Sequence, residues 1–196
     1  GVPVAIIGAP NSGKSTLLNT LLQEDRAIVS EIPGTTRDTV EEAITIDGVL
    51  FRFIDTAGIR STEDTIEKLG IERSYKKATE ASIVVLLGDA SVMSEGAFLT
   101  QATMLRERIG NGPQVIPVLN KTDLPGAQKG GKLMHISAKT GGGISELKDA
   151  FIEHVQALRE GDVSLLADAL AATGTESVQT VWIERGKACD LNFDGD

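Results

Sequence analysis

Two stretches near the start of the chain carry side chains suited to phosphate and metal chemistry. Residues 8–15 fit the pattern G-x-x-x-x-G-K-S, and a D-x-x-G pattern begins at Asp55. In the first pattern the glycines let backbone N–H groups wrap phosphates, Lys14 can neutralise β- and γ-phosphate oxygens, and Ser15 offers a hydroxyl to Mg²⁺. In the second, the Asp55 carboxylate can hold the same ion and the Gly58 N–H can meet a γ-phosphate. Together they predict a nucleoside triphosphate site.

Two later motifs carry groups that can select the base. The first is Asn120-Lys-Thr-Asp123 and the second is Ser137-Ala-Lys139. Asp123 can accept hydrogen bonds from both N1–H and the N2 amino group of guanine, an arrangement that adenine does not offer. The Ala138 N–H can donate to guanine O6, the stem of Lys121 can lie on the base, and Asn120 can tie neighbouring loops together. These motifs predict GTP and GDP rather than ATP.

A fifth motif, P-G-T-T-R-D at 33–38, lies in a long loop. Thr36 is placed there to ligate Mg²⁺ only when the γ-phosphate is present, which is how a switch loop orders with GTP and relaxes after hydrolysis. Magnesium ligands are then predicted at Ser15, Thr36 and Asp55. The predicted nucleotide contacts are Asn11, Ser12, Gly13, Lys14, Ser15, Thr16, Thr35, Thr36, Asp55, Gly58, Asn120, Lys121, Asp123, Ser137, Ala138 and Lys139.

Apolar runs alternate with helical patterns and place these motifs where strands end. Strands are predicted at Val2–Ile7, Glu41–Ile46, Val49–Ile54, Ser82–Leu87, Gln114–Leu119 and Leu133–Ile136, and helices at Lys14–Leu22, Ile66–Thr79, Ala97–Ile109, Ile144–Leu158 and Val163–Ala172. Asp47-Gly48 is a two-residue hairpin signal. The alternation predicts an α/β fold of the P-loop NTPase class, a Ras-like G domain with a doubly wound, mostly parallel six-stranded sheet and one antiparallel strand. Ligands in such folds bind at the carboxyl ends of the strands.

Composition limits the class of protein. The 196 residues suit one nucleotide-binding domain, predicted at 1–159, followed by an acidic tail at 160–196. The formal net charge of −9 disfavours a broad nucleic-acid surface. No apolar run approaches the roughly 20 residues of a membrane span. A signal peptide is not predicted either, because Lys14 lies inside a motif rather than in the basic region of such a peptide. Cys189 is the single cysteine, so a reducing cytoplasm is the expected compartment.

One absence bears on mechanism. In Ras-like GTPases the residue after D-x-x-G is a glutamine that orients the attacking water, whereas here it is Ile59, which neither donates nor accepts a hydrogen bond. Acidic side chains of the adjoining segment that could replace it are Glu63, Asp64, Glu67 and Glu72. Positive charge could come from Arg37, Arg52, Arg60 or a monovalent cation beside Asn11.

Beyond the shared motifs, the chain resembles the tRNA-modification GTPase family MnmE, also called TrmE, from Gly1 to about Gly143. The resemblance rests on Pro10-Asn11, Ala27-Ile-Val-Ser30, Gly34-Thr-Thr-Arg-Asp38, Asp55-Thr-Ala-Gly-Ile-Arg60 and Ile66-Glu-Lys-Leu-Gly-Ile-Glu-Arg-Ser74. The last stretch is the most specific, because related bacterial GTPases read differently there.

The resemblance implies a potassium-stimulated GTPase whose G domains pair when GTP is bound. By motif position Glu67 would be the carboxylate that orients water through a second water, acting with Lys14 and Gly58. Asn11 would ligate K⁺ together with oxygens of Ser30, Ile32 and Thr35. It also implies that the whole protein acts in tRNA wobble-uridine modification, with a flavoprotein partner and tRNA. The composition, for its part, predicts no membrane association.

The chain also departs from the family pattern. Family members carry a folate-binding domain and a helical domain with a Cys-x-Gly-Lys motif, which Cys189 and its neighbours do not match. The sequence is therefore interpreted as a G domain cut from a longer protein. Two alternatives stay open: a ribosome-assembly GTPase similar to Der or Era, and a GTP-gated binding module with little turnover, which Ile59 permits.

Overall fold

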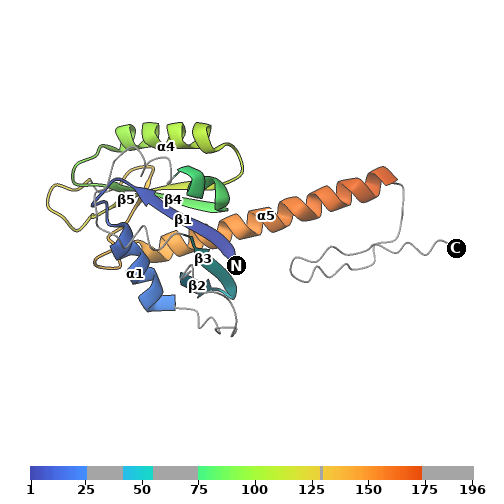
Figure 1. Ribbon diagram of the computed structural model, residues 1–196, viewed down its shortest axis with the longest axis horizontal. Helices are drawn as coiled ribbons and strands as arrows, with labels where there is room; N and C mark the ends of the chain where they lie inside the picture. Colours follow the sequence, from blue (N-terminus) through green and yellow to red (C-terminus); the bar gives the residue numbers. More distant parts are fainter. Residues whose placement is uncertain (26–41, 55–74, 129, 174–196) are drawn as a thin grey trace. The chain divides into compact units, whose positions relative to one another are not determined.

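The computed structural model describes residues 1–25, 42–54, 75–128 and 130–173, with side chains up to residue 161 (Figure 1). The elements are β1 (Val2–Gly8), α1 (Lys14–Asp25), β2 (Glu42–Ile46), β3 (Val49–Phe53), β4 (Ile83–Asp89), α4 (Glu95–Ile109), β5 (Gln114–Asn120), β6 (Met134–His135) and α5 (Ile144–Thr173). Residues 75–80 are also helical.

The described strands form one six-stranded sheet in the order β2-β3-β1-β4-β5-β6. The β2–β3 pair is antiparallel, and the other neighbouring strands pair in parallel. This confirms the predicted α/β fold with one antiparallel strand. Because β1, β4, β5 and β6 are parallel, their carboxyl ends meet at one edge of the sheet, and ligands of such folds bind at that edge.

The turn between β2 and β3 has the geometry that its sequence predicts. Asp47 and Gly48 have φ values of 47° and 77°. Two successive residues with positive φ are characteristic of a type I′ turn, whose twist matches that of the flanking strands. The hairpin then continues with Phe51 and Phe53 fully buried, so β3 enters the core directly before the D-x-x-G motif.

Alternation along the strands gives the sheet two apolar faces. Val4 and Ile6 of β1 belong to the cluster covered by α1 and the first half of α5, whereas Ala5 belongs to the cluster covered by α4. Figure 1 shows α4 on one side of the sheet and α1 on the other. Side chains of successive strand residues point to opposite faces, so one short apolar strand supplies both cores.

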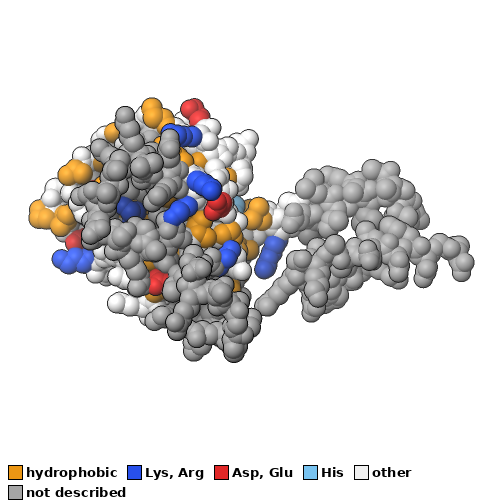
Figure 2. Space-filling view, in the orientation of Figure 1, with side chains coloured by type: hydrophobic (Ala, Val, Ile, Leu, Met, Phe, Trp, Pro, Cys, Tyr) orange, Lys and Arg blue, Asp and Glu red, His pale blue; other side chains and the backbone are white. Residues whose placement is uncertain are grey.

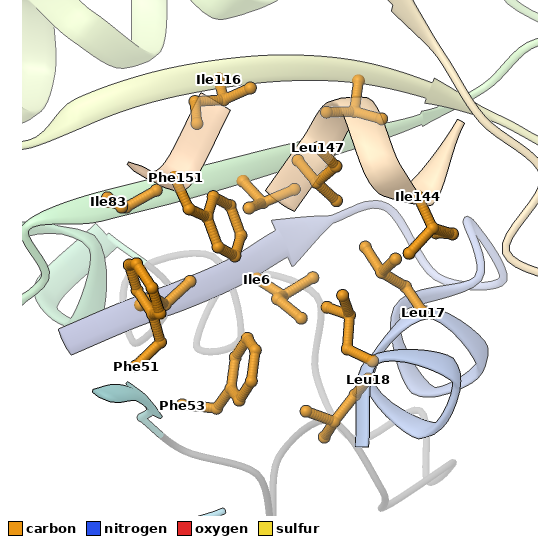
Figure 3. Close-up of a cluster of buried hydrophobic side chains, with 14 of the residues drawn as sticks. Ile6, Leu17, Leu18, Phe51, Phe53, Ile83, Ile116, Ile144, Leu147 and Phe151 are labelled. Carbon is orange, nitrogen blue, oxygen red and sulfur yellow. The ribbon is translucent and has the colours of Figure 1, made fainter. Parts of the chain in front are cut away.

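Helix α1 is held against the sheet by leucines one turn apart. Leu17, Leu18 and Leu21 are 0 % exposed, and Figure 3 shows Leu17 and Leu18 close to Ile6 of β1. Fully burying a leucine side chain contributes about 1.5–3 kcal/mol. The carboxyl end of α1 is tied to α5, because Lys148 pairs with Glu24 at 2.5 Å and with Asp25. The start of α1 is thereby fixed at the functional edge of the sheet.

Helix α5 departs from the prediction. Two helices, Ile144–Leu158 and Val163–Ala172, were predicted, but a single helix runs from Ile144 to Thr173. Gly161 lies inside this helix and is tolerated, because one glycine within a helix costs only about 1 kcal/mol. The chain divides into compact units Gly1–Gln156 and Ala157–Asp196, a boundary three residues before the predicted one. None of the described helices is both long and apolar enough to cross a bilayer.

Candidate functional site

The loop between β1 and α1 forms a tight turn. The Ser12 N–H donates to the Ala9 carbonyl at 3.3 Å, and Asn11 and Gly13 have φ values of 61° and 99°. A Cβ atom at Gly13 would lie 2.3 Å from Asn120 Nδ2. Glycine is therefore required at position 13 both for its backbone conformation and for this close approach.

Lys14 opens helix α1 and turns back over the loop. Its Nζ donates to the carbonyls of Gly8 at 2.9 Å and Ala9 at 2.8 Å. The side chain is half-buried, and this burial lowers the pKa of Lys14. The cation thus lies over the loop that leads into α1, and the backbone N–H groups and dipole at the start of that helix favour an anion. Ser15 and Thr16 occupy the next positions of the same helical turn.

Asn120, the last residue of β5, joins two loops. Its side chain is 2 % exposed; Nδ2 donates to the Ser12 carbonyl at 2.9 Å and Oδ1 accepts from the Ala138 N–H at 2.9 Å. The predicted tie between neighbouring loops is therefore confirmed in these contacts. The same Ala138 N–H is the group assigned by sequence to guanine O6, and in this structure it is donated to Asn120.

Asp123 is oriented by a serine from the other base-recognition motif. The Ser137 hydroxyl donates to Asp123 Oδ1 at 2.7 Å, and the Thr140 N–H donates to that hydroxyl at 3.2 Å. The hydrogen bond from Ser137 is the main reason that the pKa of Asp123 lies below its ordinary value, with the charges of Lys139 and Lys121 acting in the same direction. The carboxylate is exposed and ionised at neutral pH, so both oxygens can accept N–H groups.

A surface cavity of about 380 Å³ borders these two motifs. Thr122, Asp123 and Ser137 contribute to its wall, together with His135 of β6 and residues of the two adjoining loops. His135 Nδ1 lies 2.9 Å from the Leu133 carbonyl. The cavity is thus a hollow with several polar groups directly beside the carboxylate that is predicted to read the base.

Sequence reasoning did not identify three residues that support the site. Thr20 Oγ1 donates to the Ala138 carbonyl at 2.7 Å and so links α1 to the Ser137-Ala-Lys139 loop. Asp89 lies 2.6 Å from the Lys121 ammonium, and Ser91 donates to Asp89. None of the three belongs to a motif, and the Thr20–Ala138 and Asp89–Lys121 contacts depend on how strands and helices are brought together.

The remaining predicted residues fall into two groups, those that the structure describes and those outside the described residues. Among the described residues, Asn11 and Lys139 are exposed, Ser15 is half-buried, and Arg52 lies in β3. The other predicted ligands and catalytic groups lie outside the described residues: Ser30, Ile32, Thr35, Thr36, Asp55, Gly58 and Glu67. The same holds for Arg37, Ile59 and Arg60, and for Glu63, Asp64 and Glu72.

Comparison with known proteins identifies the class. The profile of the family described as "50S ribosome-binding GTPase" matches residues 3–121. The crystal structure of an Aquifex aeolicus Era variant bound to GDP and AlF4⁻ is 28% identical with a TM-score of 0.52, covering 78% of this chain and 56% of that one. The G domain of the T. maritima FeoB iron transporter is 27% identical with a TM-score of 0.53, covering 79% of this chain and 98% of that domain.

Two curated relatives of the chain carry the same name. A protein named tRNA modification GTPase MnmE from Bacteroides thetaiotaomicron is 57% identical over 127 residues, which are 63% of this chain and 26% of the relative. One of the same name from Christiangramia forsetii is 40% identical over 217 aligned positions, covering 99% of this chain and 46% of the relative. The chain thus spans less than half the length of these relatives.

The fold and the two groups of loops define a P-loop GTPase, an enzyme that binds and hydrolyses GTP. Within that class, the chain belongs to the family of 50S ribosome-binding GTPases.

Proposed function

We propose that this chain is the GTP-hydrolysing domain of a tRNA-modification GTPase. The observation that carries the proposal is the 40% to 57% identity with relatives of that name. The stretch of the resemblance that distinguishes these relatives from other bacterial GTPases, at 66–74, is part of this sequence. Modification itself belongs to the whole protein, since this chain covers less than half of each of those relatives.

Base selection is assigned to the Asp123 carboxylate. The ionised, exposed oxygens oriented by Ser137 match the paired N1–H and N2 donors of guanine. Lys121 supplies a stem for stacking, and Lys139 adds positive charge at the same end of the site. The Ala138 N–H reaches guanine O6 when it is released from, or shared with, Asn120.

Phosphate binding is assigned to the loop before α1. Lys14 would exchange its two carbonyl partners for β- and γ-phosphate oxygens, with the amides of 12–16 around them. The Ser15 hydroxyl, one residue into α1, is the hard oxygen ligand that Mg²⁺ prefers. Thr36 and Asp55 complete the proposed magnesium ligands, and the ion would neutralise phosphate charge.

Water positioning is assigned to Glu67 because Ile59 has no polar group. The side chain of Asn11 is exposed, and its backbone φ is 61°. Its amide oxygen is a suitable ligand for K⁺ beside the phosphates. Ser30, Ile32 and Thr35 are the further proposed ligands. The cation would supply positive charge that other GTPases take from an arginine. Two copies would pair through their nucleotide-binding faces when GTP is bound.

Handling of tRNA and of a flavoprotein partner is assigned to other parts of the whole protein. The net charge of −9 disfavours a broad nucleic-acid-binding surface on this chain. On the face shown in Figure 2, the basic side chains of the described residues are interspersed with acidic and apolar ones.

A salt and concentration series tests the hydrolytic proposal. GTP hydrolysis is measured in KCl and in NaCl at equal ionic strength and at several protein concentrations. We expect faster turnover in KCl and a specific rate that rises with concentration, because the active species is a pair. Equal slow rates in both salts at all concentrations would instead favour a GTP-gated binding module.

A single substitution tests the water-positioning role. Glu67→Ala is expected to reduce turnover by about 10²–10⁴-fold while fluorescent GDP still binds. Glu63→Ala, the same change nearby, serves as the matched control. Normal turnover of Glu67→Ala would move the role to another acid.

A ribosome-assembly GTPase is the second candidate. The description of the matched family and the 28% identity with Era favour it. Deleting the gene of the whole protein and analysing both its tRNA and its ribosomes separates the two. Unmodified tRNA with normal subunits supports the first proposal, and the accumulation of immature subunits with normal tRNA supports the second.

A further inference from the structure

Asp89 is the last residue of β4 and lies at the functional edge of the sheet. In the parallel β4–β5 ladder it is in register with Asn120, the residue before Lys121. It therefore belongs, by position, to the base-recognition end of the site, although no nucleotide-binding motif includes it.

The Asp89 carboxylate is fixed on both oxygens. Oδ1 accepts from the Ser91 N–H at 2.9 Å and from the Ser91 hydroxyl at 2.6 Å, and Oδ2 accepts from Lys121 Nζ at 2.6 Å. The side chains of Lys121 and Asp89 are only 29% and 18% exposed. Burial would raise the pKa of Asp89, but the hydrogen bonds from Lys121 and Ser91 outweigh burial and lower it. The pair is thus a charged, partly buried contact with defined geometry.

Both ends of the Lys121 side chain are consequently held. Its backbone has φ 67° and follows Asn120, which is anchored to Ser12 and Ala138. Its ammonium is anchored to Asp89. A free lysine side chain carries about 2 kcal/mol of rotamer entropy, and here most of it is already lost before any base arrives.

We propose that Asp89 is a positioning residue for guanine binding, which holds the Lys121 ammonium at the end of β4 so that the four-carbon stem forms a preorganised surface for the base. Ser91 in turn orients Asp89. The inference rests on the role proposed above for Lys121.

A double-mutant cycle with Asp89→Asn and Lys121→Met tests it, with fluorescent GDP as the probe and its dissociation constant and release rate as readouts. Asparagine keeps the shape of Asp89 and removes its charge, and methionine keeps most of the Lys121 stem without the ammonium. We expect each single variant to bind GDP about tenfold more weakly, a change of about 1.4 kcal/mol. The double variant should be no weaker than the weaker single variant, because both changes break one contact.

Two further variants and a stability measurement complete the test. Ser91→Ala should lower the affinity for GDP about threefold, because Asp89 is held less firmly. This change corresponds to part of the free energy of one hydrogen bond. Asp149→Asn removes one exposed carboxylate from α5 and serves as the charge-matched control, with GDP affinity expected unchanged. Thermal unfolding of each nucleotide-free variant shows whether the fold is retained.

The outcomes separate this inference from the proposed role of Lys121. Normal GDP binding by Asp89→Asn, with weak binding by Lys121→Met, overturns the role of Asp89 and leaves that of Lys121. An equal loss from Asp89→Asn in both backgrounds also overturns it, since Asp89 would then act on the fold. Normal binding by Lys121→Met overturns the inference as well, because the retained stem would then serve the base without an anchored ammonium, and it leaves the stacking role in place.

Discussion

The phosphate end and the base end of this site are built in different ways. At the phosphate end, Lys14 donates to two carbonyls of its own loop. At the base end, side chains from separate segments bond to one another, as Ser137 does with Asp123 and as Lys121 does with Asp89. At the phosphate end, Lys14 is held by local contacts that a phosphate would replace. At the base end, Asp123 and Lys121 are held by contacts that a bound base would leave in place.

This difference indicates where binding energy is used. Partner exchange by Lys14 costs two hydrogen bonds and is favourable only because phosphate oxygens carry much more charge than carbonyls. The preorganised carboxylate of Asp123 loses little freedom when it accepts guanine. Substitutions at the phosphate end should therefore abolish binding of any nucleotide, whereas those at the base end should change selectivity or affinity in steps.

Lys14→Ala is expected to have the largest effect. Removing the cation should lower the rate of GTP hydrolysis by at least about 10²–10³-fold, the cost typical of losing one charge-stabilising donor. It should also weaken the binding of GTP and of ATP to the same extent. Turnover assays and competition binding measure this. Because the contacts of Lys14 are with its own loop, the unfolding midpoint should change little, and wild-type turnover would contradict the assignment.

Asp123→Asn should affect the base and leave the phosphate end intact. The amide presents a donor to guanine N–H groups, so GTP affinity should fall about a hundredfold, as for two charge-assisted hydrogen bonds. Xanthosine triphosphate, which offers an acceptor at C2, should be favoured instead. Competition between the two nucleotides measures the reversal, and a retained preference for GTP would show that another group reads the base.

Asn120→Ala tests how the two ends are joined, because Asn120 bonds to a loop of each. The change removes two hydrogen bonds and leaves the Ser12 carbonyl and the Ala138 N–H without their partner. Each buried unsatisfied group costs about 1–3 kcal/mol, so for two groups the free energy of unfolding should fall by about 2–6 kcal/mol. Urea denaturation measures it, with the exposed Asn19→Ala as control. A loss equal to that of the control would mean that the loops hold together without this residue.

Ser137→Ala should have the smallest effect and the clearest pH dependence. Loss of one hydrogen bond should lower the affinity for GDP by about twofold to tenfold at neutral pH. The pKa of Asp123 is lowered mainly by Ser137, so base recognition persists above that low pKa and is lost as pH falls through it. Without the hydroxyl the pKa rises toward its ordinary value, and acid loss of GDP binding should begin at higher pH. The exposed Ser145→Ala should leave the titration unchanged.

Local signals predicted the order of strands and helices well. The apolar run of β1, the Asp47-Gly48 turn and the glycine-rich loop each have short-range causes, and the structure has all three. The prediction of two helices at Ile144–Leu158 and Val163–Ala172 was wrong, because the single Gly161 between them costs less than the neighbouring helical turns gain. The segments that carry Thr36, Asp55 and Glu67 lie outside the described residues, and their roles stay predictions.

Residue types at fixed spacing were enough to predict the class of protein and its ligand, because motif chemistry depends on them. The same pattern predicts which groups face the nucleotide, since parallel strands bring their ends to one edge. How those groups are held depends on the fold of the whole domain. The links from Thr20 to Ala138 and from Asp89 to Lys121 join residues 118 and 32 positions apart, and no local pattern encodes a contact that depends on the packing of whole elements.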